Sequence, residues 1–68
     1  MRKFAEELKE IRTEKELSIH KLSKEVDISA GAICHWENGK NDIKSDQLIS
    51  LAKFFDVSTD YLLGLEDY

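Results

Sequence analysis

The stretch that most restricts the fold of this chain runs from Ser18 to Gly39 and reads SIHKLSKEVDISAGAICHWENG. Serine is favoured immediately before a helix, and Ser18 and Ser29 each precede a short run of apolar residues at helical spacing. The stretch closes on an asparagine–glycine pair, and glycine commonly ends a helix in the left-handed conformation. We therefore predict helices over 19–26 and 30–38, joined by a tight turn, which is the layout of a helix-turn-helix.

The two expected helices are short, so they need a shared core. A helix of about two turns is not stable alone in water and depends on the packing of its apolar face. At the turn, Asp27 stands where a left-handed residue is needed, a conformation that aspartate adopts at some cost. The residues of this stretch that we expect to be buried are Leu22, Val26, Ile28, Ile33 and Trp36.

Apolar residues at helical spacing predict three further helices on either side of this stretch. The first covers about 2–15, the second follows Ser45 as its N-cap, and the third is a short helix over 59–63. In the second of these, Ile49 and Phe54 are expected to widen the apolar stripe. The fold class is therefore all-α, with five short helices around one core.

Length and composition favour one small soluble domain. The 68 residues are close to the lower limit for a chain that folds on one core, and we expect that core over 4–64 with a short acidic tail at 65–68. No run approaches the 18 apolar residues of a membrane span, so none is expected. A single cysteine allows no internal disulfide, which fits the reducing cytoplasm.

The charge of the chain is unevenly distributed. The formal net charge is −4 and the isoelectric point is near 5.0, which alone would argue against a nucleic-acid partner. Residues 1–17 and residues 18–53, however, each carry five basic and five acidic side chains, whereas residues 54–68 carry four acidic and no basic ones. The negative excess lies at the C-terminal end, so the net charge does not exclude DNA binding.

Two runs, Trp36–Lys40 (WENGK) and Phe55–Gly64 (FDVSTDYLLG), are the most specific parts of a resemblance that extends over 4–64. Over this range the sequence resembles the lambda Cro/repressor helix-turn-helix domains, also called Xre-type regulators. The resemblance implies a lambda-repressor-like five-helix domain that binds DNA and regulates transcription, usually as a repressor. It also implies an ion pair between Arg12 and Glu37, which would neutralise a carboxylate on the inner side of its helix.

The resemblance also implies where DNA would be held. Phosphate contacts, which need cations and N–H donors, belong to the start of the second helix, the loop after the third and the start of the fourth. The matching residues are Ser18, Lys21, Asn38, Lys40, Asn41, Lys44 and Ser45. The base-facing positions of the third helix are held by Ser29, Ala30, Gly31, Cys34 and His35.

These base-facing positions have little hydrogen-bonding capacity. The family typically places Gln, Arg, Ser or Lys there, and favours Gln where this chain has Ile19. No Arg or Gln is present to bind a base with two hydrogen bonds. We expect His35 to donate to a guanine or a phosphate, Ser29 to either, and the methyl groups of Ala30 and Ala32 to contact thymine. Specificity should be modest, with DNA shape contributing much of it.

The adjacent Cys34 and His35 do not indicate a metal site or a catalytic pair. With only His20 elsewhere, they lack the spacing of a zinc site, and no pocket or oxyanion site is indicated for a nucleophile. We expect no enzyme activity, no cofactor, no metal and no small-molecule ligand.

The expected partner is double-stranded DNA, bound by a homodimer, because one small domain makes few contacts. Tyr61, Leu62, Leu65 and Tyr68 are candidates for the dimer surface, although Tyr61 and Leu62 could equally complete the core. An alternative from another functional class stays open. The low isoelectric point and the bare tip of the third helix are also compatible with a protein-interaction module that has lost operator reading.

Overall fold

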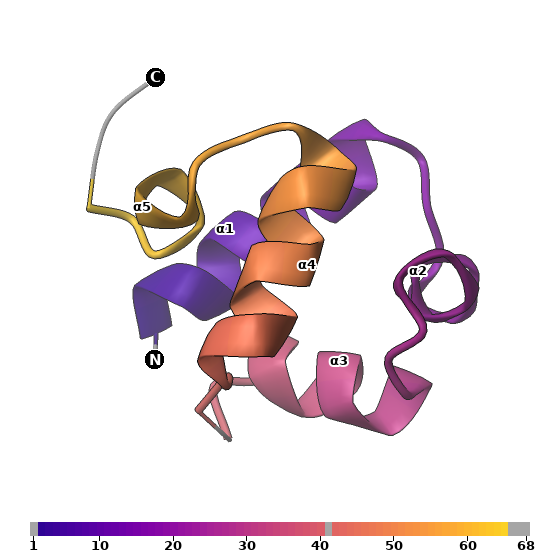
Figure 1. The fold of residues 1–68 in the computed structure, drawn as a ribbon. Helices are drawn as coiled ribbons and strands as arrows, with labels where there is room; N and C mark the ends of the chain where they lie inside the picture. Colours follow the sequence, from indigo (N-terminus) through magenta and orange to yellow (C-terminus); the bar gives the residue numbers. More distant parts are fainter. Residues whose placement is uncertain (1, 41, 66–68) are drawn as a thin grey trace.

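The computed structural model describes residues 2–40 and 42–65. Over these ranges the chain forms five helices and no strands: α1 (Arg2–Glu14), α2 (Ile19–Val26), α3 (Ala30–Glu37), α4 (Ser45–Phe55) and α5 (Thr59–Leu62). α1 passes behind α4, α3 packs against α1 and α2, and α5 packs against α1 and α4 (Figure 1). The predicted all-α fold of five helices is confirmed.

One hydrophobic core joins all five helices. α1 supplies a stripe at helical spacing, and Phe4 of this stripe packs its ring 6.2 Å from that of Trp36 on α3. The predicted burial of Leu22, Ile33 and Trp36 is confirmed, whereas Val26 and Ile28 are half-buried at the edge of the core. The buried residues of the core cluster are Phe4, Leu8, Ile11, Leu22, Ile33, Trp36, Leu51, Ala52, Phe55 and Leu62.

Three of the helix junctions share one local structure. In each, an acidic residue adopts the left-handed conformation, the next residue is a half-buried aliphatic, and the third is a serine that caps the following helix. The three junctions are Glu16–Leu17–Ser18, Asp27–Ile28–Ser29 and Asp56–Val57–Ser58, with φ of 57°, 56° and 58° at the acid. Each aliphatic residue donates its N–H to the carbonyl five residues earlier, as in a Schellman motif. These junctions fix how each helix leaves the one before it.

Two sequence-based expectations need correction. The N-cap of α4 is Lys44 and not Ser45, because Lys44 is the extended residue (φ −82°, ψ 154°) and Ser45 is already helical. The side-chain Oε1 of Gln47 accepts the Lys44 N–H at 3.3 Å, so a glutamine in the first turn satisfies the helix start. Ile49 and Phe54 are 46% and 37% exposed and so lie outside the core stripe.

The C-terminal residues were candidates for a dimer surface, with Tyr61 and Leu62 equally candidates for the core. Leu62 is fully buried in the core and cannot present its side chain to another molecule. Tyr61 is half-buried and packs against the same core, whereas Leu65 is 72% exposed. Tyr68 lies outside the described residues. Among the described members of this set, Leu65 alone has the exposure that an interaction surface requires.

Gly39 and Gly64 provide a matched pair for a stability prediction. Both have positive φ (71° and 75°), but a Cβ on Gly39 would meet nothing within 4 Å, whereas one on Gly64 would lie 2.9 Å from Cβ of Lys3. We expect Gly39→Ala to cost about 1–2 kcal/mol from the left-handed backbone. Gly64→Ala should cost at least about 1 kcal/mol more, because α1 and the end of α5 must also separate. Urea unfolding measures the difference, and equal costs would contradict the close approach.

Candidate nucleic-acid interface

The start of α2 brings two of the predicted phosphate-binding residues together. Ser18 is extended (φ −78°, ψ 163°), and its Oγ accepts the backbone N–H of Lys21 at 3.0 Å. Both residues are exposed. The hydroxyl of Ser18 still has its own proton to donate, so this helix start offers a hydroxyl and an ammonium to an anion beside it.

The outer side of α3 carries the predicted base-facing residues. Ser29 caps the helix by accepting the N–H of Ala32 at 3.1 Å. The exposed residues of this surface are Ser29, Gly31, His35 and Asn38, and the half-buried ones are Ala30 and Cys34. Ala32 is half-buried and packs partly against the core, and its contact with thymine stays a prediction. The side chains at the start of this surface are small.

The carboxamide at the end of α3 is engaged within its own helix. Nδ2 of Asn38 donates to the carbonyl of Cys34 at 2.9 Å and lies 3.5 Å from its Sγ. A carboxamide that reads adenine must present its oxygen and its nitrogen together to the base. Asn38 is therefore not placed to read adenine, because both hydrogen bonds from its Nδ2 go to Cys34.

The junction after α3 differs from the other helix junctions in its residue types. Gly39 takes the left-handed position and Lys40 follows it, donating its N–H to the carbonyl of His35 at 2.9 Å. The other described junctions of this form place an aliphatic residue where Lys40 stands. Lys40 is exposed, so this polar replacement presents a cation beside the outer surface of α3.

The loop then reaches the start of α4 beside α3 (Figure 1). Lys44 and Ser45 are exposed. They lie at the N-terminus of α4, which is the positive end of the helix dipole. Asn41 lies outside the described residues. Asp42 and Asp46 are also exposed and reduce the local positive potential, so the surface around Lys44 is only weakly positive.

The predicted ion pair holds α3 to the end of α1. Arg12 Nε and Nη2 donate to the two carboxylate oxygens of Glu37 at 2.7 and 3.0 Å, with side-chain exposures of 14% and 6%. The hydrogen bond with Glu37, and secondarily its charge, raise the pKa of Arg12, whereas burial acts in the opposite direction. Arg12 Nη1 also donates to the carbonyl of Leu17 at 2.7 Å, an interaction that the sequence did not indicate. One guanidinium thus joins α1, the α1–α2 connection and α3.

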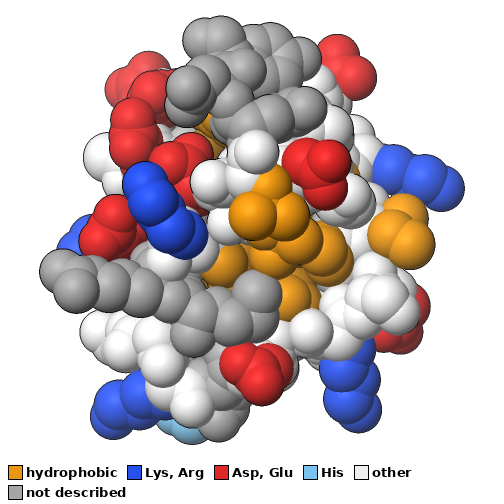
Figure 2. Space-filling model, turned by 90° about the vertical axis from the view of Figure 1, so that its left-hand side faces the viewer, with side chains coloured by type: hydrophobic (Ala, Val, Ile, Leu, Met, Phe, Trp, Pro, Cys, Tyr) orange, Lys and Arg blue, Asp and Glu red, His pale blue; other side chains and the backbone are white. Residues whose placement is uncertain are grey.

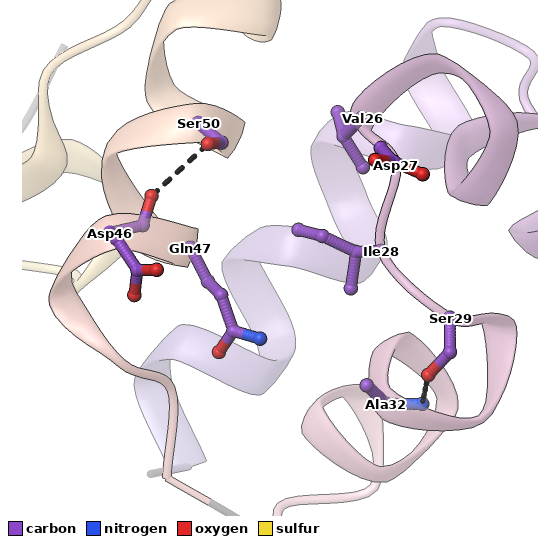
Figure 3. A pocket seen from close by; sticks show the side chains of 8 residues that line it. All are labelled: Val26, Asp27, Ile28, Ser29, Ala32, Asp46, Gln47 and Ser50. Carbon is purple, nitrogen blue, oxygen red and sulfur yellow. Dashed lines mark hydrogen bonds between the residues drawn. The ribbon is translucent and has the colours of Figure 1, made fainter.

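An open groove of about 430 Å³ lies between the α2–α3 turn and the first turns of α4 (Figure 3). Val26 and Ile28 lie on its α2–α3 side, while Gln47 points into it from α4 (Figure 3). The carboxylates of Asp27 and Asp46 belong to its lining and would repel a phosphate. We therefore do not assign this groove to the DNA backbone.

Neither a metal centre nor a membrane span is present over 2–40 and 42–65. No group of three or more His, Cys, Asp or Glu side chains in these ranges lies where it could hold a metal ion. None of the helices in the same ranges is long and apolar enough to cross a membrane.

The helix-turn-helix and its outward surface define the class of protein. The chain belongs to the helix-turn-helix domain family, whose model matches residues 5–67. The resemblance to helix-turn-helix regulators drawn from the sequence is thereby confirmed.

Particular relatives are named as regulators of transcription. Over 64 residues, 94% of this chain, it is 38% identical to the HTH-type transcriptional activator BcrR of Enterococcus faecalis and 30% identical to the uncharacterized HTH-type transcriptional regulator YobD of Bacillus subtilis (strain 168). A transcriptional regulator from Listeria innocua has a similar crystal structure, with a TM-score of 0.84 and 26% identity over 96% of this chain. This chain spans 31%, 57% and 61% of the lengths of these three proteins. Transcriptional regulators are not enzymes as a class.

Proposed function

We propose that this domain binds double-stranded operator DNA with α3 in the major groove and acts as a repressor. The observation that carries the proposal is the placement of exposed cations on both sides of a helix-turn-helix. Lys21 stands at the start of α2, and Lys40 and Lys44 stand between α3 and α4. Such cations can neutralise phosphates on the two strands that border one groove. This function places the domain with the chromosome, in the cytoplasm.

Binding to a random pool of duplexes tests the proposal directly. We expect selected duplexes to share a site, and the affinity for them to fall as salt is added, because phosphate binding releases counterions. His35→Ala and Lys40→Ala should each weaken the binding of the selected duplex. Unchanged affinity in both variants would contradict the assigned interface.

A homodimer is the second part of the proposal. Two copies on a two-fold operator would double the small set of contacts that one domain makes. Figure 2 shows hydrophobic side chains gathered at the centre of the face that lies on the left in Figure 1, where α5 is located. The exposed Leu65, three residues after α5, supports an interaction surface near that helix. Light scattering that finds only monomer at high concentration, with and without DNA, would contradict the dimer.

The direction of regulation needs its own experiment, because one relative is named as an activator. A reporter whose promoter overlaps the selected site should fall in expression when the domain is present. A rise in expression would identify activation instead.

A protein-interaction module is the second candidate function. The isoelectric point near 5.0 and the lack of Arg, Lys or Gln on α3 favour it. Salt-dependent binding to duplex DNA decides between the two, since a module that no longer binds DNA would show no such binding.

A further inference from the structure

Two of the three junctions with a left-handed acidic residue, in the part of the chain that the structure describes, carry a second link made by a side chain. In each junction the N–H of the aliphatic residue donates to the carbonyl five residues earlier. Before α2, the residue that supplies this carbonyl is Arg12, and its Nη1 donates in return to the carbonyl of Leu17 at 2.7 Å. Before α3, the same residue is Ser23, and its Oγ donates in return to the carbonyl of Ile28. These two junctions lead into the two helices of the helix-turn-helix.

The junction before α5 shows that the backbone turn does not need this second link. Ala52 stands in the corresponding position, and its carbonyl accepts the N–H of Val57 at 3.0 Å. Its methyl group has no hydrogen to donate, yet this junction also has a left-handed acidic residue and a serine N-cap. The turn between α2 and α3 is therefore compatible with alanine at position 23, and the hydroxyl of Ser23 adds a constraint that the turn itself does not require.

The hydroxyl of Ser23 constrains the direction in which α3 begins. The carbonyl of Ile28 belongs to the planar peptide unit that leads into Ser29, the N-cap of α3. A hydrogen bond from α2 to this carbonyl holds the plane from which α3 starts, and Ser23 is half-buried, so water competes for it only in part. The other end of α3 is held by the ion pair between Arg12 and Glu37, the last residue of the helix. Side chains thus link α3 to the rest of the domain at both ends.

We propose that Ser23 is a positioning residue for DNA binding, whose hydroxyl holds the first turn of α3 in the orientation that DNA requires. The inference rests on the proposed function, because Ser23 acts through α3. A helix of eight residues is about 12 Å long, so a tilt of about 10° about its far end moves its first residues by about 2 Å. A binding surface must be held to within about 0.5 Å of its productive geometry, so a small tilt is enough to weaken recognition.

Ser23→Ala tests the inference in the intact chain, with a duplex selected from a random pool and a scrambled duplex of the same composition. We expect affinity for the selected duplex to fall about 5- to 20-fold, because the first turn of α3 is no longer held in place. Affinity for the scrambled duplex, which depends on phosphate contacts, should change less than about twofold. The ratio of the two affinities is the decisive measurement, because a loss of folded protein alone would lower both affinities by the same factor.

Ser50→Ala is the matched control. Oγ of Ser50 also donates to a backbone carbonyl, that of Asp46 at 3.1 Å, but both residues belong to α4, so this bond holds no second element (Figure 3). We expect Ser50→Ala to leave both affinities unchanged. If the wild type discriminates between the two duplexes and Ser23→Ala discriminates equally well, the inference is overturned while the proposed function stands. If the wild type binds no duplex, or binds both alike, the proposed function fails and the inference with it.

Discussion

Arg12→Ala is expected to destabilise this domain by about 2–4 kcal/mol. The substitution leaves the carboxylate of Glu37, 94% of whose side chain is removed from solvent, without its two hydrogen bonds. It also leaves the carbonyl of Leu17 without a donor from Arg12. The lower end of this range is below the usual cost of breaking a fully buried ion pair, because part of the guanidinium is exposed to solvent. For a domain of this size, such a destabilisation lowers the melting temperature by about 10 °C or more.

Lys15→Ala is the control for this prediction. Lys15 follows α1 by one residue and is exposed, so its removal should change stability by less than about 0.5 kcal/mol. Thermal and urea unfolding of both variants gives the comparison, and equal shifts would contradict a special role for Arg12. Because Arg12→Ala leaves a buried charge, the double variant Arg12→Met with Glu37→Leu should recover part of the stability.

At alkaline pH, the stabilising contribution of the ion pair depends on the charge of Arg12. The pKa of Arg12 is raised above its ordinary, strongly alkaline value, so its stabilising contribution is complete below the ordinary value and is lost only at still more alkaline pH. Arg12 therefore remains charged throughout the range in which the domain can be studied, and it contributes no pH dependence there.

The helices could be predicted because local signals and the apolar pattern agreed. Ser18 and Ser29 act as the expected N-caps, and Asp27 takes the expected left-handed conformation. Glutamate is a weaker turn signal than aspartate, so the third junction of this form, at residue 16, could not be identified in the same way.

One error has a local cause and the other a tertiary cause. Ser45 follows a lysine that takes the cap position, and the helix start is satisfied by Gln47 instead, which no capping rule for Ser45 anticipates. Ile49 and Phe54 are apolar, but α4 has room in the core for only one side, and Leu51 and Phe55 occupy it.

The residue types of the candidate site could be predicted from the sequence. The hydrogen bonds and packing contacts of these residues could not. The sequence placed Asn38 among the DNA-binding residues, but its hydrogen bond to Cys34 depends on how the side chain folds back along α3. Similarly, Ala32 is one residue from Gly31 yet packs against the core, because neighbouring helical residues point about 100° apart. Side-chain direction on a helix two turns long is sensitive to where that helix begins.

The double variant Lys40→Ala with Lys44→Ala is expected to weaken DNA binding about 10- to 100-fold at moderate salt, because it removes two cations that neutralise phosphates. Both lysines are exposed, so the fold should be unaffected. Lys40 occupies the position that other helix junctions fill with a half-buried or exposed aliphatic, and Lys44 stands at the positive end of α4. The slope of log affinity against log salt should become shallower by about 0.9 for each phosphate that is no longer neutralised.

Lys9→Ala with Lys53→Ala is the matched control, because it removes the same two charges from a formal net charge of −4. Lys9 lies on α1 and Lys53 in the last turn of α4, and both are exposed. If net charge alone governed binding, the two double variants would weaken it equally. Because charges within a Debye length of the phosphates dominate, the loop variant should show a far larger decrease in affinity and in salt slope than the control. Equal decreases in titrations at several salt concentrations would show that the loop is not where DNA is held.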